Sequence, residues 1–251
     1  MSPGVAPLRC VILDTGDVDR PTLRAAAEFA RLLRLEILGV FIEDPSLLAL
    51  ASLPFARELR MPEYGWQALM PQRLDEELRV AGLRARERFR EEIELRGLPG
   101  RFEVRRGDPA TLTEAVAQPS DVLIVAAEPQ AAGAFAPAHA LVRRAALASA
   151  ASLLLLPQTG MAGPGPVAAV VDSEAGPCFE LASRIAAATG EVAIAVPRMD
   201  DSSSAALSAS LAQALGPRGE RLLVVPRELA ALDALLSVAA ERRIPVLLVA
   251  D

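Results

Sequence analysis

Carboxylates end two similar apolar runs of the chain, at positions where a side chain could contact a ligand. The first run, LRCVILD at 8–14, ends in Asp14 and is followed by Thr15. The second, VAAVVD at 167–172, ends in Asp172. In open α/β sheets, ligands bind in a crevice beyond the carboxyl ends of the parallel strands. Asp14 is therefore a candidate ligand residue, and the alternative is that it only caps the helix that follows.

A second candidate region extends from Ala126 to Ala140. It follows the apolar run at 122–127, which is typical of a strand buried on both faces of a parallel sheet. The loop leaving such a strand is a usual ligand position. It contains the only histidine of the chain, His139. A histidine there could titrate near neutral pH or contact an anion; the alternative is that it has no chemical role.

Composition excludes several kinds of chemistry. All basic residues are arginine, so the chain has no P-loop lysine and no Schiff-base lysine. A single histidine excludes a multi-histidine metal site, and no metal site is expected. The net charge of -6 and the pI near 5.1 argue against a nucleic-acid or anionic-membrane surface. Two cysteines without CxxC spacing, and no apolar run of membrane-spanning length, favour a reduced cytoplasmic protein.

The elements that must position these residues follow a regular alternation. Apolar runs at 8–14, 35–42, 122–127 and 153–156, together with the segment at 101–106, predict five strands, and helical patterns separate them, the longest at 73–96. Between the second strand and that helix we expect one short helix, interrupted at Pro54, and then a loop with the only tyrosine and tryptophan, Tyr64 and Trp66. These two aromatics form either a lid or interface or a cover over the sheet.

The segment QTGMAGPGP at 158–166 separates this region from a shorter repeat of it. We therefore expect two domains, 1–158 and 166–251, and the second has one βα unit fewer. The strand-helix alternation predicts an α/β fold with doubly wound, Rossmann-like parallel sheets and right-handed crossovers. Helices are expected at 178–189, 205–215 and 228–242 of the second domain.

Several segments resemble the universal stress protein family in its tandem form. They are VILDTGDVDRPTLRAAAEFARLL, LEILGVFIEDPSLLALASLPFARELR, the RRGDPA joint, SLLLLP and, in the second half, VVDSEAGPCFELASRIAAATG. The resemblance implies strand order 3-2-1-4-5 and a site that often binds ATP. In that family the strand-end aspartate contacts adenine and a G-x2-G-x9-G-[ST] loop holds ribose and phosphates. Carried over, the nucleotide positions include Asp14, Thr15 and Val40.

The glycine motif keeps its spacing but none of its residues. Its glycines would fall on Ala126, Pro129 and His139, and its hydroxyl residue on Ala140. Proline removes an N-H donor, histidine adds bulk and alanine lacks the hydroxyl. Losing three or four charge-assisted hydrogen bonds costs on the order of 5 kcal/mol. That turns a roughly micromolar ligand into a millimolar one.

The sequence therefore predicts a non-catalytic protein with a degenerate nucleotide site and no cofactor, which works in stress response through dimer or partner contacts. The alternative is a sensor of ATP, AMP or another small ligand at the Asp14 crevice. An enzyme is least expected, because no motif supplies a nucleophile or base.

The last strand of each half, at 153–156 and 246–249, is an uncharged apolar run that would be an exposed edge. We expect these strands to pair with each other, antiparallel, within one chain. A homodimer through either edge is the alternative.

Overall fold

A computed structural model describes residues 9–16, 18–60, 65–126, 136–157, 163–172, 176–197, 219–228 and 232–250 of the 251-residue chain. Its first half contains β1 (Arg9–Asp14), α1 (Arg20–Leu33), β2 (Glu36–Glu43), α2 (Pro45–Ala51), β3 (Arg57–Arg60), β4 (Gly65–Ala68), α3 (Pro71–Leu95), β5 (Gly100–Arg106), α4 (Pro109–Val116), β6 (Asp121–Ala126), α5 (Ala136–Ala148) and β7 (Ser152–Leu156). The second half contains β8 (Val167–Val171), α6 (Pro177–Thr189), β9 (Ala193–Pro197), β10 (Leu222–Pro226), α8 (Leu232–Arg242) and β11 (Val246–Val249).

Three helices of the first half begin with the same local chemistry. Asp19, Asp44 and Asp108 each accept a hydrogen bond from a backbone N-H of the first helical turn, at 2.8 Å, and a proline lies within the first two helical positions. The carboxylate satisfies an N-H that has no partner inside the helix, and proline has no N-H to satisfy. These caps fix where each strand-to-helix connection ends.

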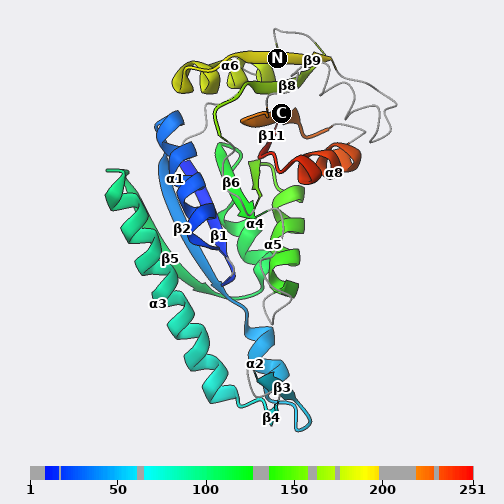
Figure 1. Cartoon of the computed structure of the whole chain (residues 1–251). Helices are drawn as coiled ribbons and strands as arrows, with labels where there is room; N and C mark the ends of the chain where they lie inside the picture. The colour runs from blue at the N-terminus through cyan, green and yellow to red at the C-terminus, as the bar shows by residue number, and fades with distance from the viewer. Residues whose placement is uncertain are drawn as a thin grey trace.

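Nine strands form one sheet in the order β5-β2-β1-β6-β7-β11-β10-β8-β9. The first five follow the predicted 3-2-1-4-5 pattern, and the remaining four are the same pattern without its third strand. All neighbours in the sheet are parallel except β7 and β11. The predicted doubly wound α/β fold is confirmed (Figure 1).

The two half-sheets meet at β7 and β11, which pair antiparallel with Leu154 opposite Leu247. One hydrophobic core lies between the sheet and α1, α3 and α6, and the other lies between the sheet and α4, α5 and α8. Each core contains residues from both halves, so burial is continuous across the junction. The division into domains 1–158 and 166–251 stays a prediction.

Two arginines of the second half also reach the first. Arg221 forms an ion pair with Glu28 of α1 at 2.7 Å. Arg227, just after β10, donates to the carbonyl oxygens of Leu147, Ser149 and Ala151 where α5 ends and β7 begins. These carbonyls follow the last helical turn, so a cation is favourable there.

The region between β2 and α3 differs from its prediction. Residues 57–60 and 65–68 form the antiparallel hairpin β3-β4, where we expected helix and loop. Helix α2 ends at Ala51 because the backbone turns before Pro54, so the following ARELR segment is free to extend. Tyr64 lies outside the described residues, as does the helix expected at 205–215.

Within the described part of the chain, no helix has the length and apolar character needed to cross a bilayer.

Candidate functional site

Asp14 lies at the carboxyl end of β1, as predicted, but its carboxylate is engaged by its own turn. One oxygen, Oδ1, accepts from the backbone N-H of Gly16 at 2.7 Å and of Val18 at 3.2 Å. Gly16 has a φ of 105°, a conformation that favours glycine. The Asp14 side chain is buried, whereas Asp172 at the corresponding strand end of the second half is exposed. Asp14 therefore holds the β1-α1 turn in place.

Asp14 and Val40 line one cavity, together with Arg88 and Phe89 of α3 and Phe102 of β5. Its free volume is about 10 Å³. One water needs roughly 10–15 Å³ by this measure. The cavity therefore matches a single water and is far too small for an adenine ring.

An aromatic pair fills the space beside β2 that would otherwise widen this cavity. The rings of Phe89 and Phe102 lie 5.4 Å apart between centroids, at 51° to each other. Both pack on Gly39, where an added Cβ would lie 2.7 Å from Phe102 and 2.8 Å from Phe89. Glycine at this position thus allows α3 and β5 to come close to β2. The aromatic pair and Gly39 keep the crevice narrow.

The structure brings together two positions of the glycine motif, Ala126 and His139. His139 is not in a loop: it lies in the first turns of α5, with only 5% of its surface exposed. Its Nε2 is 3.1 Å from the carbonyl oxygen of Ala126, at the end of β6. A carbonyl only accepts, so Nε2 carries the hydrogen of this bond.

Val40 shares its cavity with Asp14, and the other predicted positions differ in their exposure. Thr15 and Val40 are buried, Ala140 is exposed on α5, and Pro129 lies outside the described residues. The expectation that His139 sits in an open crevice loop is wrong. The helix begins at Ala136, inside the expected loop of residues 126–140, because the Ala-rich sequence continues the helical pattern toward its N-terminus.

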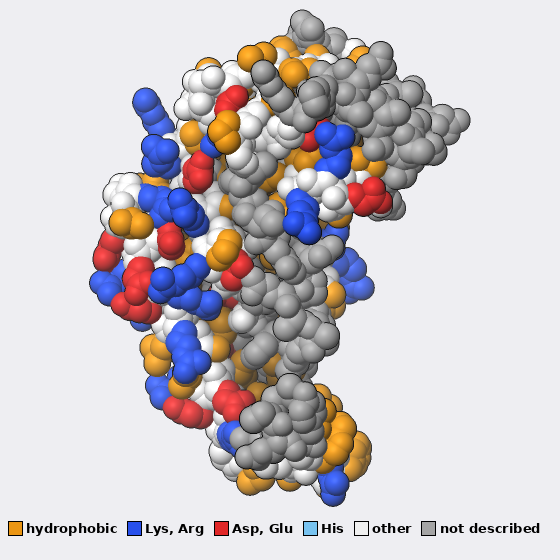
Figure 2. Space-filling view, in the orientation of Figure 1, with side chains coloured by type: hydrophobic (Ala, Val, Ile, Leu, Met, Phe, Trp, Pro, Cys, Tyr) orange, Lys and Arg blue, Asp and Glu red, His pale blue; other side chains and the backbone are white. Residues whose placement is uncertain are grey.

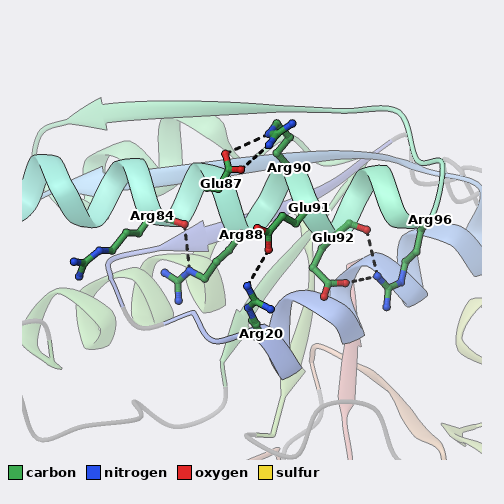
Figure 3. A network of polar contacts seen from close by, with 8 residues as sticks. All are labelled: Arg20, Arg84, Glu87, Arg88, Arg90, Glu91, Glu92 and Arg96. Carbon is green, nitrogen blue, oxygen red and sulfur yellow. Dashed lines mark hydrogen bonds and ion pairs between the residues drawn. The ribbon is translucent and has the colours of Figure 1, made fainter.

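Three arginines of α3, Arg73, Arg79 and Arg90, form ion pairs with acids of the same helix, and a glutamate of α3 pairs with an arginine of α1 (Figure 3). Arg90 contacts Glu87 and Glu94, and Arg20 of α1 contacts Glu91 at 2.9 Å. Pairs of this kind neutralise the positive charge through which a protein binds the phosphates of a nucleic acid. The expectation of no nucleic-acid partner stays a prediction.

A cavity of about 90 Å³ lies near the β7-β11 junction and was not predicted from sequence. It is lined by Arg143 of α5, by Leu155 of β7 and Pro157 after it, and by five residues around the end of α8: Leu236, Ala239, Ala240, Ile244 and Val246. Apart from Arg143 the lining side chains are apolar. No local sequence pattern could find it, because its walls come from segments about 80 residues apart that meet only through the strand pairing.

Among the described residues, no group of three or more histidine, cysteine or acidic side chains could hold a metal ion. Cys10 and Cys178 are both buried. Burial raises the pKa of the Cys10 thiol. Neither side chain therefore has the exposed thiolate character of a reactive cysteine.

Comparison with known proteins gives one kind of match. No protein-family model and no curated protein sequence matches the chain. Among solved structures, a universal stress protein from Archaeoglobus fulgidus DSM 4304 superposes with a TM-score of 0.58 and 14% identity, over 95% of this chain and 95% of that one. At this identity the likeness shows the fold. The resemblance noted in the sequence is confirmed at that level.

Proposed function

We propose that this chain is a tandem universal-stress-type protein that acts in stress response, in the cytoplasm, through protein contacts and without catalysis. Its fold is that of a universal stress protein along nearly the whole chain. In this proposal its nucleotide site has degenerated. The observation that carries the proposal is the state of Asp14: its carboxylate bonds its own turn, and the cavity beside it has about 10 Å³ of free space.

The changes at the glycine-motif positions support the same conclusion. A phosphate cradle needs backbone N-H groups that point at the ligand from a glycine-rich loop. Here the first and third motif positions are tied to each other by the His139 bond to Ala126, and the hydroxyl position is Ala140. A nucleotide would have to break a buried hydrogen bond and also displace Phe89 or Phe102 to reach Asp14.

Calorimetric titration of the full chain with ATP and with AMP tests the proposal. We expect dissociation constants of about 1 mM or weaker for both, and no phosphate release from ATP. A constant below about 50 μM would overturn the proposal. Asp14→Ala shows where any nucleotide binds: binding at the Asp14 crevice should be lost in this variant, whereas binding elsewhere should persist.

The second candidate is a sensor of adenine nucleotides or another small ligand. It is favoured by one observation, that Asp14, Val40 and the cation Arg88 line the same cavity. Mass spectrometry of small molecules released from the purified protein would detect such a ligand. A stoichiometric compound that is lost in Asp14→Ala would support this candidate against the first.

A further inference from the structure

Most of the large hydrophobic side chains that are exposed in the described structure lie in one region. Six of the ten that are exposed there lie between residues 50 and 70: Leu50, Leu53, Phe55, Leu59, Trp66 and Met70. We call these six the hairpin patch. Phe55 is 76% exposed and Trp66 is 64% exposed. Figure 2 shows hydrophobic side chains gathered at the end of the molecule where Figure 1 places α2, β3 and β4. Contiguous exposed apolar surface of this kind marks interaction sites.

The outer face of the hairpin carries Leu59 and Trp66 with the exposed Arg57 beside them, and the inner face carries Glu58. Leu59 of β3 lies directly opposite Trp66 of β4, so the two side chains are on the same face of the hairpin. Glu58, the next residue along β3, points to the other face and approaches Arg73 of α3 at 3.7 Å. The ion pair orients the hairpin, and its Leu59-Trp66 face is turned away from α3.

The free edge of β4 lacks the features that usually prevent strand pairing. Its residues, Gly65, Trp66, Gln67 and Ala68, carry no charge and include no proline. Strand β5, at one end of the nine-stranded sheet, instead carries four charges, at positions 101, 103, 105 and 106. Charges on an edge strand hinder pairing with another chain. The contrast indicates that the β4 edge is open to pairing.

We propose that the hairpin patch binds a second copy of this chain, with the two β4 strands side by side and antiparallel. A twofold contact of this kind places each residue of the patch against the same surface of the other copy. It brings no like charges together at β4, whereas two β3 strands would oppose their arginines and glutamates. The proposal deepens the proposed role in protein contacts by naming the partner.

The size of the patch agrees with a stable dimer. Aromatic side chains such as Phe55 and Trp66 bury roughly 150–250 Å² each, and leucine and methionine are smaller. At the observed exposures, the six side chains offer on the order of 600 Å² per copy and 1,200 Å² in total, the lower end of specific interfaces. The patch also lies far from the β7-β11 junction, so the pairing within the chain leaves it accessible (Figure 1).

The only tryptophan of the chain, Trp66, reports on this surface. Sedimentation equilibrium of the full chain should show a monomer-dimer equilibrium in the micromolar range. Over the same range Trp66 emission should shift to shorter wavelength and become protected from iodide. Leu59→Asp and Gln67→Arg keep the tryptophan and should each weaken dimerisation about tenfold or more. Leu95→Asp, at a leucine that is 78% exposed outside the patch, should leave it unchanged.

Circular dichroism shows whether each variant keeps its fold. Gln67 is exposed, so its variant tests the edge even if Leu59→Asp unfolds. A chain that is monomeric up to about 200 μM would overturn the proposal, as this excludes any micromolar dimer. So would a dimer unaffected by both patch variants. Neither result depends on the affinity for ATP. The dimer can therefore be disproved while the proposed loss of nucleotide binding still holds.

Discussion

Leu154 of β7 lies opposite Leu247 of β11 in the single antiparallel pairing of the nine-stranded sheet, and both side chains are fully buried. The pairing removes two apolar edges at once, one from each half-sheet. Both leucines belong to the core that also contains α1 and α6, so the junction is packed as well as hydrogen-bonded. This relationship makes the two halves one structural unit.

Leu154→Arg should therefore disrupt the whole molecule. An unpaired guanidinium in this core costs several kcal/mol, a large part of the 5–15 kcal/mol that stabilises a typical domain. We expect loss of cooperative thermal unfolding and aggregation of the purified protein. Leu95→Arg is the matched control, because this leucine is exposed on α3 and the same substitution should cost less than about 0.5 kcal/mol. A soluble Leu154→Arg protein with a normal melting temperature would contradict the prediction.

Arg227 should contribute strongly to the junction, because it serves three carbonyl oxygens of the other half. Arg227→Ala should lower the free energy of unfolding by about 3 kcal/mol, since hydrogen bonds to charged groups are worth roughly 1.5–3 kcal/mol each and water replaces part of them. Urea denaturation measures the change.

Arg227→Lys should recover only part of that loss, because an ammonium cannot reproduce the planar fork of donors. Arg144→Ala, on the exposed surface of α5, is the neutral comparison. Equal stability of Arg227→Ala and the parent chain would mean that these carbonyls are satisfied without the guanidinium.

His139→Ala should cost about 1–3 kcal/mol, because it leaves a cavity and frees the buried carbonyl of Ala126. In an open loop, where the sequence placed His139, the same substitution would cost less than about 1 kcal/mol. Thermal unfolding decides between the two values. Ala140→Ser, one residue further along and exposed, is the control and should be nearly neutral. A loss below about 0.5 kcal/mol for His139→Ala would show that the bond to Ala126 contributes little.

The sequence predicted the central strands of the large sheet because continuous apolar runs indicate buried parallel strands, whereas the edge strand β5 is charged and was not such a run. The 3.6-residue period of α3 predicts an apolar stripe through Leu74, Leu78, Ala81, Ala85, Phe89 and Ile93. The structure agrees except at one position, where Gly82 is buried and Ala81 is half-buried. Periodicity gives a stripe but cannot tell which of two adjacent small residues faces Phe41, whose ring lies 3.2 Å from the Cβ position of Gly82.

The candidate site was harder to predict than the fold. The position of Asp14 at a strand end follows from the local pattern. The direction of its carboxylate, toward its own turn, depends on the left-handed conformation of Gly16. The size of the cavity depends on Phe89 and Phe102, which are far apart in sequence and meet over Gly39. Local patterns carry no information about such contacts.

Asp108 should make stability depend on pH. It caps α4, and the hydrogen bonds from the Thr111 backbone N-H and hydroxyl lower the pKa of its carboxyl group. A group whose pKa is lower in the folded state stabilises the fold above its unfolded pKa, near 3.9 for aspartate, and loses that effect as the pH falls through the folded value. Asp108→Ala should therefore cost about 1 kcal/mol at neutral pH. The difference from the parent chain should narrow below about pH 4.

Asp108→Asn separates the charge from the cap. An asparagine oxygen accepts the same backbone bond but does not titrate, so this variant should lie close to the parent chain at pH 7. Urea denaturation of the three proteins at intervals from about pH 7 to pH 2.5 gives the comparison. The parent chain should approach Asp108→Ala in stability as the pH falls, while the difference between Asp108→Asn and Asp108→Ala stays nearly constant. A parent-to-alanine difference that does not change with pH would mean that the carboxylate charge contributes nothing to the cap.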